Sequence, residues 1–145
     1  MAEKIKYSKK SVADLIPYAN NAKKHSKAQI DKIVKSFQEF GVINPVIVDK
    51  DNGIIAGHAR VMAAKKMKLK EIDTLEVSHL TEAQKRAYIL ADNRLAELAE
   101  WDNDLLKLEL EELKNEGFDF DLTGFEENIL NDSKGSALAE YTSVI

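Results

Sequence analysis

The chain of 145 residues contains no cysteine. This absence excludes a disulfide framework, a thiolate zinc site and a cysteine nucleophile, and it fits a reducing cytoplasm. No apolar run approaches the roughly 18 residues that a membrane-spanning helix requires. The basic N-terminal segment MAEKIKYSKK has no apolar stretch behind it, so it does not resemble a secretory signal. We therefore expect a cytoplasmic protein without membrane contact.

The charged residues are distributed unevenly. The composition, 44% hydrophobic and 32% charged, is typical of a soluble globular domain. Residues 1–70 hold 15 Lys and Arg against 6 Asp and Glu, a net +9, whereas residues 71–145 hold 6 against 19, a net −13. The basic half could bind phosphates while the acidic half contacts another partner, or the two halves could neutralise each other within the fold.

A loop and a capped helix are predicted in the first third of the chain. Segment 18–25 is polar and follows Pro17, which favours a loop. Ser26 and Gln29 have the spacing of a capping box, which opens a helix, and Gly41 is placed to end that helix in a left-handed cap. The apolar residues between them recur at helical spacing and predict one buried stripe: Ile30, Ile33, Val34 and Phe37.

Three short strands are predicted next. Segments 45–48 and 54–56 are β-branched, and the turn cluster DKDNG joins them. Gly57 then precedes residues 58–68, which are rich in helix-forming Ala, Met and Lys. Segment 72–77 alternates weakly and is interpreted as a third strand. These elements predict a small mixed sheet with flanking helices.

The C-terminal half is predicted to be helical. Thr81 and Gln84 form a second capping box, and the helix that follows it runs through residues 82–100. Trp101-Asp102 interrupts the pattern, and residues 102–117 form a further helix. The predicted fold class is therefore α+β: a small mixed sheet with flanking helices, followed by a helical C-terminal half.

The segment Gly57-His58-Ala59-Arg60 lies between a strand and a helix and has the residue types of an anion site. A helix N-terminus offers free N–H groups and partial positive charge, and a glycine allows close backbone approach. Arg60 could add a bidentate contact, and His58 could donate a hydrogen bond or titrate near neutrality. A plain turn with a solvated arginine fits the local residues as well. His25 and His79 are isolated, without the spacing of a metal site.

The order of several boxes resembles the ParB N-terminal domain of the ParB/sulfiredoxin superfamily. The matching residues are Gly41-Val42-Ile43-Asn44-Pro45, then Gly57-His58-Ala59-Arg60 with Ala63, then Asp92-Asn93. The resemblance covers about residues 12 to 100. His58-Ala59 replace the Glu-Arg pair of the family pattern, so one phosphate-binding arginine is missing. Arg94 directly follows the asparagine, so the role of the family's later arginine does not carry over.

This resemblance implies a nucleoside triphosphate site that uses Mg²⁺, with CTP, the usual ligand of partition proteins, or ATP as the nucleotide. Gly57 and Arg60 would hold the phosphates, with His58 beside them. The segment from Gly41 would contribute Asn44 and Pro45 near the base. Asp92 and Asn93 would meet the metal, which suits a hard cation that prefers oxygen ligands.

The stretch from Leu80 to Leu106 is similar in particular to ParB-like domains of phage and mobile-element proteins, often joined to a DNA methyltransferase. No methyltransferase motif is present, so we expect a stand-alone version or the front piece of a split system. Sulfiredoxin activity is excluded, because its reactive thiolate has no counterpart here. The expected organisation is a nucleotide-binding domain over residues 1–100, a helical extension packed on it over 101–130 and a loose tail over 131–145.

Three functions remain open. The chain could be a nucleotide-dependent switch in DNA partition, modification or regulation, with slow hydrolysis. It could be a ParB-like nuclease or a small-molecule kinase, with His58 as the candidate general base. It could also be a specificity or scaffold subunit of a separately encoded DNA methyltransferase, docking through its acidic half.

The expected DNA contact is weak. An acidic helix follows Trp101, and such a helix is a poor reader of DNA phosphates. We therefore expect no strong sequence-specific DNA binding by this chain alone. Any DNA contact should come from the basic N-terminal half and weaken sharply with salt. A homodimer is a further candidate assembly.

Overall fold

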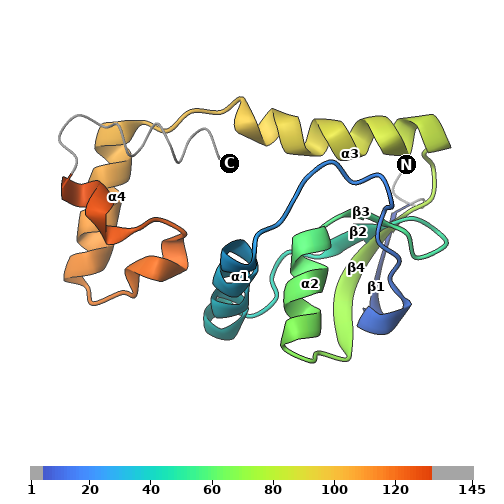
Figure 1. Ribbon diagram of the computed structural model, residues 1–145, viewed down its shortest axis with the longest axis horizontal. Helices are drawn as coiled ribbons and strands as arrows, with labels where there is room; N and C mark the ends of the chain where they lie inside the picture. Colours follow the sequence, from blue (N-terminus) through green and yellow to red (C-terminus); the bar gives the residue numbers. More distant parts are fainter. Residues whose placement is uncertain (1–4, 132–145) are drawn as a thin grey trace. The chain divides into compact units, whose positions relative to one another are not determined.

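The computed structural model describes residues 5–131 (Figure 1). The chain divides into two compact units, the first ending at Asp92 and the second beginning at Asn93. The loose tail expected over residues 131–145 lies, from residue 132 onwards, outside the described residues. Within the described range, no helix is both long and apolar enough to cross a membrane.

The first unit is built on a four-stranded mixed sheet with the order β1-β4-β2-β3. Its strands are β1 (Ile5–Ser11), β2 (Val46–Val48), β3 (Ile54–Ala56) and β4 (Glu71–Val77). Strand β4 runs antiparallel to β1 and parallel to β2, and β2 and β3 form an antiparallel hairpin. This arrangement confirms the predicted α+β class and the three predicted strands.

Strand β1 was not predicted. Its sequence IKYSKKS is polar at most positions and has no apolar run, so it lacks the pattern of a buried strand. The strand instead gains its order from pairing with β4 along its whole length, from Ile5 opposite Val77 to Ser11 opposite Glu71. Its lysines fit an edge strand, because edge charges discourage pairing with another chain.

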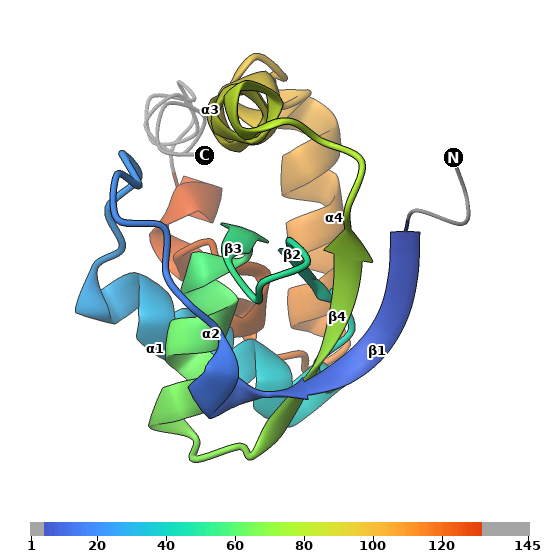
Figure 2. The same ribbon diagram turned by 90° about the vertical axis from the view of Figure 1, so that its right-hand side faces the viewer.

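Two helices lie on one side of this sheet (Figure 2). Helix α2 (His58–Lys66) packs directly against the strands, and α1 (Lys27–Phe40) packs against α2. The 3-10 helix η2 (Val12–Asp14) and helix α3 (Glu82–Glu97) complete the elements that begin in this unit. The main core joins η2, the strands and α2, and it contains Val12, Leu15, Val46, Val48, Ile54, Val61, Ala64 and Ile72. A smaller cluster between α1 and α2 contains Ile30, Ala59 and Ala63.

The predicted helix starts are present. The Ser26 hydroxyl accepts the Gln29 N–H at 3.0 Å. At α3 both halves of the capping box form, with Gln84 N–H donating to Thr81 Oγ1 at 3.1 Å and Thr81 N–H donating to Gln84 Oε1 at 2.9 Å. Gly41 ends α1 with a positive φ of 82°, but its ψ of 175° lies outside the left-handed helical region that we predicted.

The second unit contains α4 (Asn103–Asn115) and two 3-10 helices, η3 (Phe120–Thr123) and η4 (Glu127–Asn131). The Asp102 side chain caps α4 by accepting the Leu105 N–H at 3.1 Å. The core of this unit consists of Leu110, Phe120, Phe125 and Ile129, and the Trp101 ring meets the Phe125 ring edge-on at 5.2 Å. The two 3-10 helices were not predicted, because short turns of this kind show no periodicity.

Candidate functional site

Gly57 occupies a position that only glycine fits. Its φ of 104° is in the left-handed region that L side chains rarely adopt. A Cβ built on it would lie 3.3 Å from Cγ2 and 3.4 Å from Cα of Val46, at the start of β2. The turn therefore places the start of α2 directly against the β2–β3 hairpin.

The first turn of α2 presents free hydrogen-bond donors. The first helical bond runs from Val61 N–H to the Gly57 carbonyl, at 3.0 Å, and no side chain caps the helix. Within residues 5–131, the backbone N–H groups of His58, Ala59 and Arg60 have no hydrogen-bond partner. Free N–H groups at a helix start, together with the partial positive charge there, favour an anion.

Arg60 adds a full positive charge to this turn. Its side chain is half-buried, and no other described residue forms a hydrogen bond or an ion pair with its guanidinium group. The guanidinium group is therefore available to an external anion, which is the role that the sequence analysis expects of it.

His58 has a different environment from the one that we predicted. Its Nε2 accepts the backbone N–H of Tyr18 at 3.1 Å, so its proton is on Nδ1. Burial, and then the charge of His25, hold the pKa of His58 below its ordinary value. The Nε2 lone pair is used within the fold, and this geometry gives no support to His58 as a general base.

The first predicted box adjoins this turn through its last residue. Exposed Asn44 and half-buried Pro45 come directly before β2, whose first residue, Val46, contacts Gly57. The structure therefore brings Pro45 and Gly57, twelve positions apart in the sequence, close to each other. Gly41 lies at the end of α1 and serves there as a helix terminator.

Asp92 and Asn93, the predicted metal ligands, are adjacent on α3, where the boundary between the two units falls. Asp92 is exposed, and its carboxylate is one turn after Tyr88 and acts on the pKa of the Tyr88 hydroxyl. Burial, and then this carboxylate, raise the pKa of Tyr88. An exposed carboxylate next to an amide is a donor pair that fits a hard cation such as Mg²⁺. Within residues 5–131 no cluster of three His, Asp or Glu side chains could hold a metal ion by itself.

A cavity of about 200 Å³ lies near the Gly57 turn at the start of α2. The sequence analysis did not predict it. Segment 16–19 and α3 form two of its walls, and the β2–β3 hairpin forms a third. Its lining consists of Ile16, Pro17, Tyr18, Ala19, Asp49, Gly53, Ile54, Ile55, Glu82, Lys85, Arg86 and Ile89. Tyr18 belongs both to this cavity and to the hydrogen bond with His58, so the cavity and the start of α2 are neighbours. No sequence pattern predicts a cavity of this kind, because its walls come from three segments that are far apart in the sequence.

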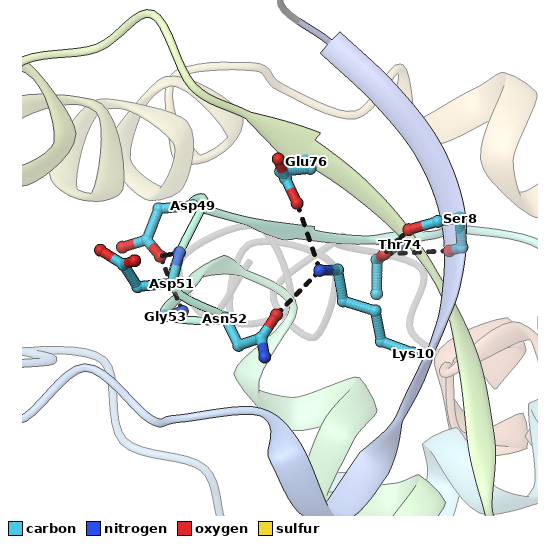
Figure 3. Close-up of polar contacts among 8 residues, drawn as sticks. All are labelled: Ser8, Lys10, Asp49, Asp51, Asn52, Gly53, Thr74 and Glu76. Carbon is cyan, nitrogen blue, oxygen red and sulfur yellow. Dashed lines mark hydrogen bonds and ion pairs between the residues drawn. The ribbon is translucent and has the colours of Figure 1, made fainter.

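Asp49 fixes one end of the cavity. It accepts the N–H groups of Asp51 and Gly53, each at 2.8 Å (Figure 3), and the Lys85 ammonium at 3.0 Å. Burial acts to raise the pKa of Asp49, but the Gly53 N–H, Lys85 and the Asp51 N–H outweigh it and lower the pKa. Lys85 on α3 is thereby tied to the hairpin turn, which holds the first part of α3 over the sheet. Since Lys85 also pairs with Glu82 at 2.6 Å, its charge is neutralised within the fold.

A second polar cluster stabilises the sheet rather than the site. Lys10 Nζ donates to Asn52 Oδ1 at 2.8 Å and to Glu76 Oε1 at 3.2 Å, joining β1, the hairpin turn and β4 (Figure 3). Fully buried Thr74 donates to the Ser8 carbonyl at 2.9 Å. The partners in this cluster are all protein groups, so the cluster explains how the sheet edge is held.

The mixed sheet, the glycine turn and the free arginine together define a ParB-type domain, and comparison with known proteins agrees. A family model described as the ParB N-terminal domain matches residues 3–94, and the chain belongs to this family. A second model, described as the ParB-methyltransferase HTH domain, matches residues 104–133. The prediction of one acidic helix in this segment overlooked the helix-turn-helix relationship, because only α4 has a helical pattern.

Among curated proteins, the chain is 43% identical over 86 residues to a ParB-like nuclease domain-containing protein, YnaK, of Escherichia coli K12. The match covers 59% of this chain and 99% of YnaK.

Among solved structures, the chain is similar to the C-terminally truncated chromosome-partitioning protein ParB from Caulobacter crescentus. In its complex with CTP-γ-S the TM-score is 0.68 at 15% identity, covering 96% of this chain and 91% of that one. In its complex with the centromeric parS site the TM-score is 0.51 at 12% identity, covering 94% and 70%. At these identities the likeness establishes the shared fold.

Proposed function

We propose that this chain binds a nucleoside triphosphate with Mg²⁺ and acts as a nucleotide-dependent switch in DNA partition, modification or regulation. The observation that carries the proposal is the start of α2, where three free N–H groups and the free guanidinium of Arg60 follow the Gly57 turn. The fold shared with a ParB solved with CTP-γ-S supports the same class of ligand.

In this proposal Gly57 and Arg60 receive the phosphates, and the nucleoside part extends towards the cavity beside Tyr18. The apolar walls of the cavity, including Ile16 and Ile89, suit a flat base. Asp92 and Asn93 would hold Mg²⁺, which neutralises phosphate charge when bound. CTP and ATP are the candidate nucleotides.

Isothermal titration of the whole protein with CTP, ATP, GTP and UTP in Mg²⁺ tests this proposal. We expect one nucleotide to bind and the Arg60→Ala variant to bind it about 10-fold or more weakly, because a charge-assisted contact is worth roughly 1.5–3 kcal/mol. Lys65→Ala removes one positive charge at the far end of α2 and is the matched control. Absence of binding by the wild type, or equal losses in the two variants, would contradict the proposal.

A nuclease is an alternative that the similarity to YnaK, a ParB-like nuclease domain-containing protein, favours. The geometry of His58 does not support it as the general base, because its Nε2 accepts the Tyr18 N–H. Incubation with supercoiled plasmid and Mg²⁺ or Mn²⁺ decides the matter. Nicking that the Arg60→Ala variant loses would favour the nuclease, whereas intact DNA at high protein concentration would count against it.

The charge of the second unit favours an additional role in binding a protein. Its described residues, 93–131, contain 3 Lys and Arg against 12 Asp and Glu, a net −9, although its family is a helix-turn-helix domain. DNA phosphates repel such a surface. We propose that this unit docks on a basic protein surface, such as that of a separately encoded DNA methyltransferase. Co-purification with the methyltransferase of a neighbouring gene tests the proposal, and a mobility shift with DNA alone that persists at high salt would contradict it.

A further inference from the structure

The structure ties the loop of residues 18–25 to the start of α2 through a single side chain. His58 is the first residue of α2, and the Gly57 turn fixes its position. Its Nε2 accepts the N–H of Tyr18, forty positions earlier in the sequence, at 3.1 Å. A backbone donor held by a half-buried imidazole is a specific contact, because the ring must have one tautomer and one orientation.

The other end of this loop is anchored separately. Ser26 caps α1, and Gln29 Oε1 lies 2.9 Å from Nδ1 of His25. Within the loop, the Asn21 N–H donates to the Tyr18 carbonyl at 3.2 Å. The tether at Tyr18 therefore fixes where the loop begins, and the cap of α1 fixes where it ends.

The loop carries positive charge to the start of α2. Lys23, Lys24 and His25 are consecutive in the loop whose beginning is held at His58 through Tyr18 and whose end is held at Gln29 through His25. His25 also contributes to the lowered pKa of His58, which agrees with this placement. Position 59, next to His58 on α2, supplies no cation: it holds an alanine, and this alanine is buried in the cluster between α1 and α2. Apart from Arg60, positive charge for a phosphate at this turn must come from another segment.

We propose that His58 is a positioning residue: it fixes the loop 18–25 so that the Lys24 ammonium group contributes to binding the phosphates at the start of α2. This inference rests on the proposed nucleotide site and assigns a role to a residue that need not contact the nucleotide. It predicts that loss of the His58 side chain weakens nucleotide binding because the loop is no longer held in place. A side chain at position 58 that can still accept the Tyr18 N–H, such as glutamine, should restore the binding.

The first test concerns the tether itself and needs no nucleotide. In the wild-type protein, the imidazole ¹⁵N shifts of His58 should show a protonated Nδ1 and an unprotonated Nε2 that accepts a hydrogen bond. In His58→Ala, the Tyr18 amide should exchange with solvent about 10-fold faster, as expected for loss of one hydrogen bond. His58→Gln should restore most of the protection, and Met62→Ala, an exposed change on the same helix, should leave it unchanged. The opposite tautomer, or unchanged Tyr18 exchange in His58→Ala, would overturn the proposal.

The second test is a double-mutant cycle on nucleotide affinity. His58→Ala and Lys24→Ala should each raise Kd several-fold, and together by clearly less than the product, because both act through one loop. His58→Gln should bind within about twofold of wild type if the acceptor is what matters. If the increase in Kd of the double variant equals the product of the increases in the two single variants, His58 does not act through the loop, and the proposal is overturned. If the wild type binds no nucleotide, the proposed function fails, while the tautomer and the Tyr18 exchange still decide whether the tether exists.

Discussion

Replacing Gly57 by Ala should destabilise the first unit substantially. Two effects add at this position: a left-handed φ of 104° and a Cβ that would lie 3.3–3.4 Å from Val46, in part against backbone. The first costs about 1–2 kcal/mol for an L residue, and crowding in a packed region costs about 1–3 kcal/mol. We therefore expect a loss of about 2–5 kcal/mol in the free energy of unfolding, a large part of the roughly 5–15 kcal/mol that a domain possesses.

Urea denaturation followed through NMR amide signals of β2 and β3 would measure this loss in the first unit. Gly124→Ala is the matched control, because Gly124 also has a positive φ, 83°, but nothing lies within 4 Å of its Cβ position. The free energy of unfolding that Gly124→Ala loses, measured by Trp101 fluorescence in the second unit, should be about 1–2 kcal/mol, from backbone strain alone. A Gly57→Ala variant that loses less than Gly124→Ala would refute the reasoning that the contact with Val46 forces glycine here.

Three further predictions concern the site and its scaffold. Because the pKa of His58 is lowered from 6.5, its contribution to stability is present above pH 6.5 and is lost as pH falls from 6.5 to the folded-state pKa. Thermal melts between pH 5 and 8 should show this decrease in wild type and a smaller one in His58→Gln; equal slopes would contradict it. Ala19→Trp places an indole on an exposed wall of the cavity and should weaken nucleotide binding but spare inorganic tripolyphosphate, as titrations with both ligands would show. Equal losses would argue against a nucleoside in the cavity. Thr81→Ala removes the hydroxyl that accepts the Gln84 N–H, while the backbone N–H of residue 81 can still donate to Gln84 Oε1. The change should cost about 1 kcal/mol in urea denaturation, whereas an unchanged midpoint would show that the cap is not needed.

The elements with strong local patterns could be predicted from the sequence. Helix α1 has a capping residue and an apolar stripe, and the β2–β3 hairpin has β-branched segments around an Asn-Gly turn. The ends were less accurate: α2 ends at Lys66 and α3 at Glu97, earlier than propensity indicated. The strand β1 could not be predicted, because its order comes from pairing with β4, which lies 66 positions away at Ser8 and Thr74.

The candidate site was predictable only where its residues are contiguous. Gly57 and Arg60 lie within four positions, and the local chemistry of a glycine at a helix start is visible in the sequence. The cavity was not visible, because Asp49 and Lys85 meet across 36 positions. A lone Asp before a turn suggests only an Asx turn, which is also present here. Nothing in the sequence indicates that its second oxygen holds a lysine of another helix.

The structure changes the interpretation of His58, a residue that the sequence analysis singles out. A histidine next to a phosphate turn suggests a base or a ligand, since both roles require a free ring nitrogen. In the structure, Tyr18 supplies a backbone N–H to Nε2, and burial favours the neutral ring. A general base would need the Nε2 lone pair of His58 to be free. A residue that holds the loop needs the same lone pair to accept the Tyr18 N–H. The hydrogen bond that argues against His58 as a general base is therefore the same one that the proposed tether requires.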